Sequence, residues 1–173
     1  MGGAFTAAGS APTPLSRSDK HSIYGKLKTL SGQYADLIIV AGSIFYQKGG
    51  TVHAKKGYNV VPVLHNGQLI HKYYKKMDDG NLKAADNQAA WNYKDTDPIF
   101  QVNGITFGIE VCGENSDPQH SLQKWVQNNG GARVDVHIWL AGTTAHSKNN
   151  LAAKVGGYCL HNDLLTGRNI VEE

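Results

Sequence analysis

The sequence predicts an α/β protein with a mixed sheet. Apolar runs of strand length alternate with helical patterns along the chain, and this alternation is typical of α/β folds. Two of the apolar runs are split by Asn-Gly, at residues 66–67 and 103–104. Because Asn-Gly favours the tight turn of an antiparallel hairpin, parallel and antiparallel strands are expected in the same sheet.

The length and composition predict one domain. The chain has 173 residues, and 40% of them are hydrophobic, so it can bury one substantial core. Residues 1–17 are rich in Gly, Ala, Ser, Thr and Pro, which predicts a flexible N-terminal arm. We therefore expect residues 18–173 to form a single domain.

The charge and hydropathy of the chain indicate which classes of binding partner to expect. The net charge is +3, and the 17 Lys and Arg residues are scattered, which does not favour a nucleic-acid partner. No apolar run approaches the ~20 residues of a membrane helix, and the first residues lack a signal-peptide pattern. We expect a cytoplasmic protein without a membrane partner.

The first half of the chain predicts a helix, a strand and a hairpin. Ser18 is a plausible N-cap, and Ile23, Leu27 and Leu30 then recur at helical spacing. Residues 36–43 are a short apolar run that ends in Gly-Ser, which indicates a buried strand. Residues 57–76 contain two strand-like runs around the first Asn-Gly.

The second half predicts a longer series of elements. A polar stretch at 77–97 is expected to be a loop that covers something functional, and the second hairpin, at 99–112, ends on Cys112. A helix is expected within 117–131, where three apolar residues share a face and two glycines follow. The remaining segments predict a strand at 134–142, a short helix at 147–157 and a last strand at 158–163.

The two cysteines have different surroundings in the sequence. Cys112 stands at the exit of an apolar run and is followed by glycine, glutamate and asparagine, a position that suits a nucleophile. Cys159 lies inside a short apolar run, where cysteine behaves as a small hydrophobic residue. A chain of this size does not need a disulfide for stability, so both thiols are expected to be reduced.

The order of these segments resembles the carbon–nitrogen hydrolase family of nitrilases and amidases, over roughly residues 34–168. Residues 36–46 resemble a family strand that ends in Gly-Ser, and residues 57–76 resemble the strands that lead to the catalytic lysine. Residues 107–118, FGIEVCGENSDP, resemble the strand and elbow that bear the nucleophilic cysteine. The resemblance implies a nitrilase-like α-β-β-α sandwich with a mixed sheet, shortened at both ends.

The resemblance also implies a catalytic apparatus. Cys112 matches the nucleophile that forms a thioester, and Lys75 matches the lysine that stabilises the charged intermediate. Lys76 is the alternative, because successive strand residues point to opposite faces and only one of the two can face Cys112. Glu114 matches the acidic residue that follows the cysteine. Gly113 replaces the usual aromatic residue, so the size of the substrate stays open.

One carboxylate of the family pattern is missing. The family's general-base glutamate precedes the lysine, whereas this chain has no glutamate before Glu110. Possible substitutes are Asp36, Asp78, Asp79, Glu110 and Glu114. The chain is therefore a piece of a longer protein, a non-catalytic relative, or a shortened enzyme that uses another base.

Histidine offers a second class of mechanism. A Cys–His–Asn or Cys–His–Asp arrangement, as in thiol proteases and deamidating toxins, would pair Cys112 with His137, His146 or His161, the last of which is followed by Asn162 and Asp163. No spacing of His and Cys predicts a metal site, and nothing in the sequence suggests a cofactor.

The leading hypothesis is a hydrolase that acts on the carbon–nitrogen bond of a small amide or nitrile. The alternative is a nitrilase-like protein that keeps the fold for association with a partner. A homo-oligomer is implied by the resemblance.

Overall fold

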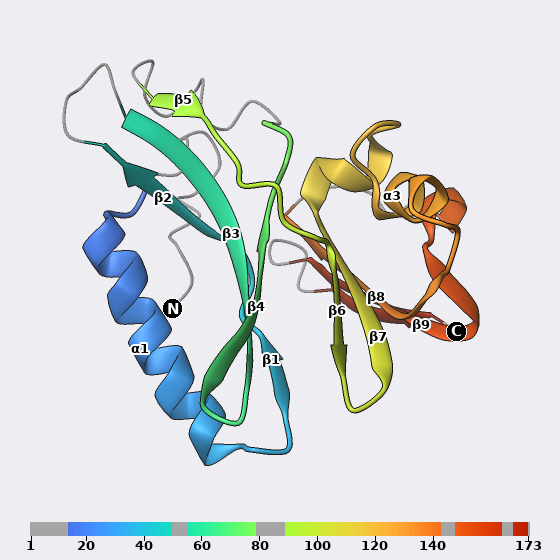
Figure 1. The fold of residues 1–173 in the computed structure, drawn as a ribbon, viewed down its shortest axis with the longest axis horizontal. Helices are drawn as coiled ribbons and strands as arrows, with labels where there is room; N and C mark the ends of the chain where they lie inside the picture. Colours follow the sequence, from blue (N-terminus) through green and yellow to red (C-terminus); the bar gives the residue numbers. More distant parts are fainter. Residues whose placement is uncertain (1–13, 50–54, 79–88, 143–147, 164–167, 173) are drawn as a thin grey trace. The chain divides into compact units, whose positions relative to one another are not determined.

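The computed structural model describes residues 14–49, 55–78, 89–142, 148–163 and 168–172. The chain divides into two compact units, the first ending at Thr96 and the second beginning at Asp97. Within the described residues, each unit contains a five-stranded mixed sheet with helical structure (Figure 1). The expectation of a single domain over residues 18–173 stays a prediction.

The first unit begins with helix α1 (Arg17–Gln33), whose N-cap is Ser16. Ser16 Oγ accepts a hydrogen bond from the Asp19 amide at 3.0 Å, and the Asp19 carboxylate accepts one from the Ser16 amide at 3.2 Å. This reciprocal pair forms a capping box. The prediction of Ser18 as the N-cap was therefore wrong, because Ser16 is the serine with an acidic residue three positions later.

The residues just before α1 do not belong to a flexible arm. Leu15 donates its amide hydrogen bond to the Phe45 carbonyl at 2.9 Å, and its own carbonyl accepts from the Gln47 amide at 2.8 Å. The predicted arm was therefore wrong for residues 14–17, and residues 1–13 lie outside the described residues.

The buried face of α1 differs from the predicted one. Lys20, Tyr24 and Ser31 are buried, whereas Leu30 is 42% exposed. Ser31 Oγ accepts a hydrogen bond from the Gly67 amide at 3.1 Å, so the end of the helix packs closely on the hairpin turn through a small polar residue. Leu30 then points away from the sheet.

The first sheet is organised around its longest strand, β3 (Lys55–His65). Strands β1 (Ile38–Val40) and β2 (Ile44–Lys48) pair with one edge of it, and β4 (Gln68–Tyr74) and β5 (Ala89–Trp91) pair with the other. The predicted strand at 36–43 is thus shorter than expected and resumes as β2, which was not predicted. Strand β5 was also missed, because it lies in the predicted loop; residues 79–88 of that loop lie outside the described residues.

Both predicted hairpins are confirmed. At the turn between β3 and β4, Asn66 has φ 47° and Gly67 has φ 72°. At the turn between β6 (Ile99–Val102) and β7 (Ile105–Val111), Asn103 has φ 51° and Gly104 has φ 81°. Positive φ at both central residues is what a two-residue hairpin turn requires.

The second sheet has the order β10-β9-β8-β7-β6. Strands β7, β8 (Val134–Ala141) and β9 (Ala153–Asp163) run parallel, and β6 and β10 (Arg168–Glu172) are antiparallel to their neighbours. The predicted helix at 147–157 was wrong: only Lys148–Asn150 form a helical turn, η3. Pairing with β8 draws the following residues into β9, which contains the predicted last strand; β10 was not predicted.

Helix α3 (Leu122–Asn128) packs on β7, following the short 3-10 helix η2 (Cys112–Ser116). Leu122 and Val126 form a core cluster with Val134 and Ala152. Gly108 on β7 leaves room for Leu122 in its present position, because an added Cβ would lie 2.5 Å from a methyl carbon of that side chain. None of the helices in the described ranges combines the length and apolar composition needed to cross a membrane.

Candidate active site

Cys112 occupies a strained backbone position. It directly follows β7, and its φ is 55°, in the left-handed region that costs residues other than glycine about 1–2 kcal/mol. The other described residues that share this conformation without being glycine are Asn66 and Asn103, and asparagine tolerates it in turns. Backbone strain of this kind gathers at functional sites, which singles out Cys112.

Two hydrogen bonds hold the turn at Cys112, which we call the elbow (residues 111–116). The Trp139 indole Nε1 on β8 donates to the Cys112 carbonyl at 3.0 Å. Glu114 Oε2 accepts from the Val111 amide at 2.8 Å. The backbone on both sides of Cys112 is therefore anchored, while the cysteine itself is half-buried.

Glu114 lies in the same elbow as Cys112. The glutamate is fully buried, and one of its carboxylate oxygens satisfies the last amide of β7. Both residues belong to η2, and their catalytic roles stay predictions. The hydrogen bond from Trp139 to the elbow was not predicted. The available signal was that a buried indole N–H needs an acceptor.

Glu110 belongs to a different network, on the α3 side of the sheet. Its Oε1 accepts from Asn115 Nδ2 at 2.5 Å, and its Oε2 accepts from the Leu122 amide at 2.9 Å. His137 Nε2 lies 2.8 Å from Oε1, and His137 Nδ1 accepts from the Ala152 amide at 3.3 Å. Both carboxylate oxygens of Glu110 are thus engaged, which favours a structural role that ties the elbow to α3.

The other cysteine is buried within β9. Cys159 is 2% exposed and pairs in register with His137, as expected for a cysteine that acts as a small hydrophobic residue. The two cysteines do not form a disulfide.

In the first unit, burial distinguishes Lys75 from Lys76. The Lys75 amide donates to the Asn59 carbonyl at 2.9 Å, which extends the ladder one residue past β4, and Lys75 is only 2% exposed. Lys76 Nζ instead forms a 3.2 Å ion pair with Asp95, whose side chain is 89% exposed. Because lysine is rarely buried to this extent, Lys75 is the better candidate for a functional cation.

The structure describes two of the three histidines of the alternative Cys–His mechanism, His137 and His161. The His161 ring stacks on Trp139, with centroids 4.1 Å apart, so Trp139 contacts both His161 and the Cys112 backbone. His137 is held by Glu110 and Ala152. His146 lies outside the described residues.

The other carboxylates considered as substitutes for the missing general base are three aspartates. Asp36 is exposed in the turn after α1, and Asp78 is half-buried, whereas Asp79 lies outside the described residues. In the described part of the chain, no group of three or more His, Cys, Asp or Glu side chains could hold a metal ion.

No protein-family model matches the sequence, and no curated protein sequence does either. Solved structures do match. Nit3 of Saccharomyces cerevisiae, from branch 10 of the nitrilase superfamily, aligns with 88% of this chain and 57% of its own length, at 17% identity and a TM-score of 0.57.

The chain has a nitrilase-like fold. The NitN amidase of Nesterenkonia sp. AN1 aligns with 83% of this chain and 54% of its own length, at 10% identity and a TM-score of 0.54. A carbon–nitrogen hydrolase of Helicobacter pylori aligns with 76% and 42%, at 14% identity and a TM-score of 0.52. The predicted fold class is confirmed, and the chain spans roughly half the length of these neighbours.

Proposed function

We propose that this protein is a carbon–nitrogen hydrolase that acts on a small amide or nitrile through Cys112. The observation that carries the proposal is the left-handed backbone of Cys112 at the exit of β7, held by Trp139 and Glu114. Structural neighbours add support. In a variant of the Nesterenkonia amidase, the acetamide moiety of fluoroacetamide is bound covalently to the active-site cysteine.

In the proposed reaction, the Cys112 thiolate attacks the amide carbon, and a carbon–sulfur bond forms. The carbonyl oxygen becomes anionic, and the resemblance to nitrilases assigns its stabilisation to the Lys75 ammonium. The carbon–nitrogen bond then breaks as the nitrogen takes up a proton and leaves as ammonia or an amine. Water hydrolyses the thioester, which releases the carboxylic acid and regenerates the thiol. A nitrile would first form a thioimidate, which water converts to the same thioester with release of ammonia.

Glu114 is our candidate for the proton acceptor. Of the carboxylates considered, it is the one that lies within the elbow itself, and it is fully buried. Its Oε2 accepts a hydrogen bond from the Val111 amide. The Glu114→Gln variant distinguishes a structural role of Glu114 from a role as proton acceptor. Glutamine can still accept the hydrogen bond from the Val111 amide, but it cannot accept the thiol proton. If Glu114 is the general base, the activity of Glu114→Gln should fall at least ~100-fold with little loss of stability.

The test of the whole proposal is covalent trapping combined with turnover. Purified protein is incubated with 2-fluoroacetamide and with iodoacetamide, adducts are located by peptide mass spectrometry, and ammonia release is measured on a panel of aliphatic amides and nitriles. We expect rapid modification of Cys112, slow modification of Cys159, and ammonia release that the Cys112→Ser variant loses. Equal, slow labelling of both cysteines without turnover would instead favour an interaction protein.

A further inference from the structure

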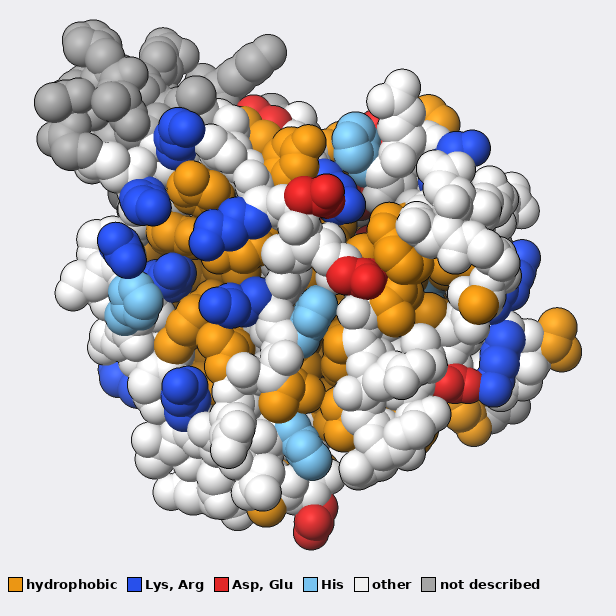
Figure 2. All heavy atoms as spheres, viewed as in Figure 1, with side chains coloured by type: hydrophobic (Ala, Val, Ile, Leu, Met, Phe, Trp, Pro, Cys, Tyr) orange, Lys and Arg blue, Asp and Glu red, His pale blue; other side chains and the backbone are white. Residues whose placement is uncertain are grey.

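Cationic side chains gather on the α1 side of the first unit. The group, which we call the basic patch, consists of Arg17, Lys20, Lys48, Lys72 and Lys94. These residues come from α1, β2, β4 and the segment after β5, so folding collects five of the chain's 17 Lys and Arg residues from distant points in the sequence. Figure 2 shows Lys and Arg side chains concentrated over this region.

The sheet register builds the patch at some cost in stability. Lys48 on β2 lies directly opposite Lys56 on β3, and like charges in this position repel each other. The next pair on the same face is Tyr46 and Tyr58, whose rings are stacked 5.3 Å apart. Lys48 of the patch and the neighbouring Lys56 thus lie beside two buried tyrosines, and no described acidic residue is paired with either lysine in the ladder.

Lys20 lies at the floor of the patch. It is 7% exposed, and its Nζ lies 4.2 Å from the ring centroid of Tyr46 and 5.4 Å from that of Tyr24. Burial lowers the pKa of Lys20, and the charges of the other four patch residues lower it further. Contacts with aromatic rings attract an ammonium group but do not neutralise it.

Tyr24 supplies a second, independent observation. This residue is nine-tenths buried beside Lys20, and its hydroxyl group makes no hydrogen bond within the described part of the protein. Burial raises the pKa of Tyr24, which keeps the O–H as a donor. A buried donor without an acceptor costs about 1–3 kcal/mol, and an anion bound over Lys20 would supply the acceptor.

The acidic residues nearest to the patch along the chain are engaged elsewhere. Asp19 accepts hydrogen bonds from Ser16 in the capping box of α1. Asp95 forms its ion pair with Lys76. Neither of these contacts involves a patch cation.

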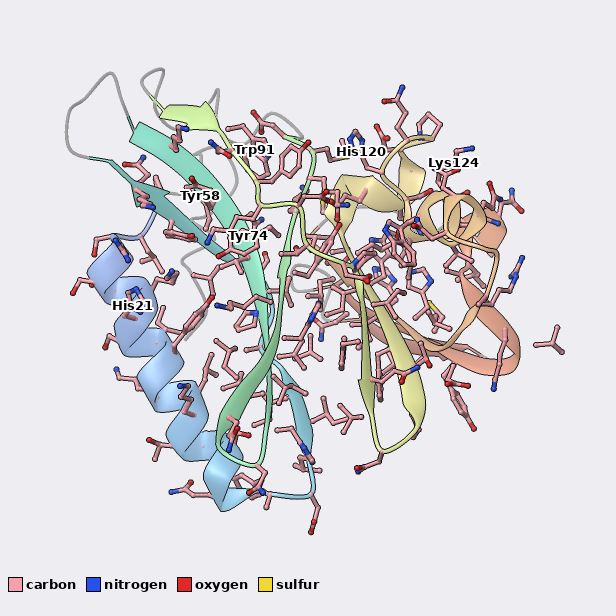
Figure 3. All side chains as sticks on the ribbon, viewed as in Figure 1. His21, Tyr58, Tyr74, Trp91, His120 and Lys124 are labelled. Atoms are coloured by element: carbon pink, nitrogen blue, oxygen red, sulfur yellow. The ribbon has the colours of Figure 1, made fainter. Side chains whose placement is uncertain are left out.

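We propose that the basic patch binds a small anion that carries several phosphate groups. Five cations distributed over four segments suit a multivalent ligand, since a single phosphate would reach only some of them. The tyrosines of the patch are buried, including Tyr58 and Tyr74, which are labelled in Figure 3, so they offer no stacking platform for nucleic-acid bases. This site does not depend on the chemistry proposed for Cys112.

The experiment is calorimetric titration of the full chain with inorganic tripolyphosphate and, separately, with orthophosphate, at low and moderate salt. We expect tripolyphosphate to bind more tightly, with an affinity that falls as salt rises, and to raise the melting temperature. The double variant Lys72→Ala/Lys94→Ala removes two exposed patch cations and should weaken binding about tenfold or more. The matched control is Lys26→Ala/Lys28→Ala, two exposed lysines of α1 that are not patch residues, which should change affinity less than about threefold.

Two outcomes would overturn the proposal. One is equal affinity for tripolyphosphate and orthophosphate, or an equal loss of affinity in the patch and control variants. The other is binding of a single-stranded oligonucleotide, or of vesicles with anionic phospholipid, that tripolyphosphate does not displace. Circular dichroism of each variant establishes that the protein remains folded.

Discussion

The two Asn-Gly hairpins have the same turn but deliver their functional residues differently. In the β3–β4 hairpin, Lys75 comes directly after the second strand, and its amide continues the ladder to Asn59. In the β6–β7 hairpin, Cys112 also comes directly after the second strand, but there the backbone enters the left-handed region. The two hairpins thus share a turn type but differ in the backbone conformation of the residue that follows the second strand.

The difference matches what each side chain is proposed to do. An ammonium group acts through its electric field, so Lys75 needs burial but no unusual backbone. A nucleophile must present its sulfur in a defined direction, and the strained turn at Cys112 provides this at a cost in stability. The anchors from Trp139 and Glu114 hold the turn in place. Of the two strand exits, the one with the strained backbone is therefore the one that carries the bond-forming atom.

The largest effect is expected when the bond-forming atom is removed. In Cys112→Ala the proposed hydrolysis should fall by about 10⁴-fold or more, because no thioester can form. The matched control is Cys159→Ala, which shortens a buried side chain on β9 and should keep kcat within about threefold where the protein is folded. Ammonia release measures both. Comparable activity in wild type and Cys112→Ala would contradict the role of the elbow.

The two lysines at the end of β4 should differ next most strongly. In Lys75→Met kcat should fall about 10²- to 10³-fold, since loss of one electrostatic donor costs about 3–4 kcal/mol in the transition state. Lys76→Met breaks the pair with exposed Asp95, so kcat should stay within about twofold and stability within about 1 kcal/mol. Steady-state kinetics and urea unfolding of both variants provide the measurement. Equal losses of kcat would show that burial does not identify the functional lysine.

The backbone strain at Cys112 should have a smaller effect than the changes above, and it should be visible in the free energy of unfolding. Both Cys112→Gly and Cys112→Ala remove the thiol, but glycine adopts a φ of 55° without strain, whereas alanine does not. The glycine variant should therefore be more stable than the alanine variant by about 1 kcal/mol in urea unfolding. At Ile109, in the unstrained middle of β7, the order should reverse, because alanine suits a regular strand better than glycine. Alanine more stable than glycine at position 112 would remove the argument from strain.

The features that sequence reasoning predicted are local ones. Asn-Gly specifies its turn within two residues, so both hairpins and the position of Cys112 at a strand exit could be predicted. The choice between Lys75 and Lys76 stayed open, because alternation shows that two neighbours differ but not which of them is buried. Residues 147–157 were misassigned as a helix because the competing interaction, pairing with β8, involves residues far away in the sequence.

The basic patch shows the same limit on a larger scale. Its members are separated by up to 77 positions, from Arg17 to Lys94, so the charges look scattered along the chain. Only the register of β2 and β4 against β3, and the packing of α1, bring them together. A pattern of charges in the sequence reveals a patch only when one helix or strand carries all of its residues, whereas the residues of the basic patch come from four segments.

The smallest expected effect concerns an anchor just beyond the elbow. Asp117 Oδ1 accepts from the Gln119 and His120 amides, both at 2.8 Å, and lies 2.8 Å from His120 Nδ1. Burial by itself would raise the pKa of Asp117, but these hydrogen bonds outweigh it and lower the pKa below the usual value. As the pH falls, the unfolded chain therefore takes up a proton at Asp117 before the folded protein does.

Asp117 thus contributes stability above its unfolded pKa of about 3.9, and this contribution is lost as the pH falls through the lower folded value. Urea unfolding of the wild type should lose stability between about pH 5 and pH 3 more steeply than that of Asp117→Asn, by less than about 1 kcal/mol. The control is Asp95→Asn near the end of the first hairpin, where the carboxylate is almost fully exposed and solvent screens its ion pair. If Asp117→Asn follows the wild-type pH profile, the Asp117 carboxylate does not stabilise the segment after Cys112.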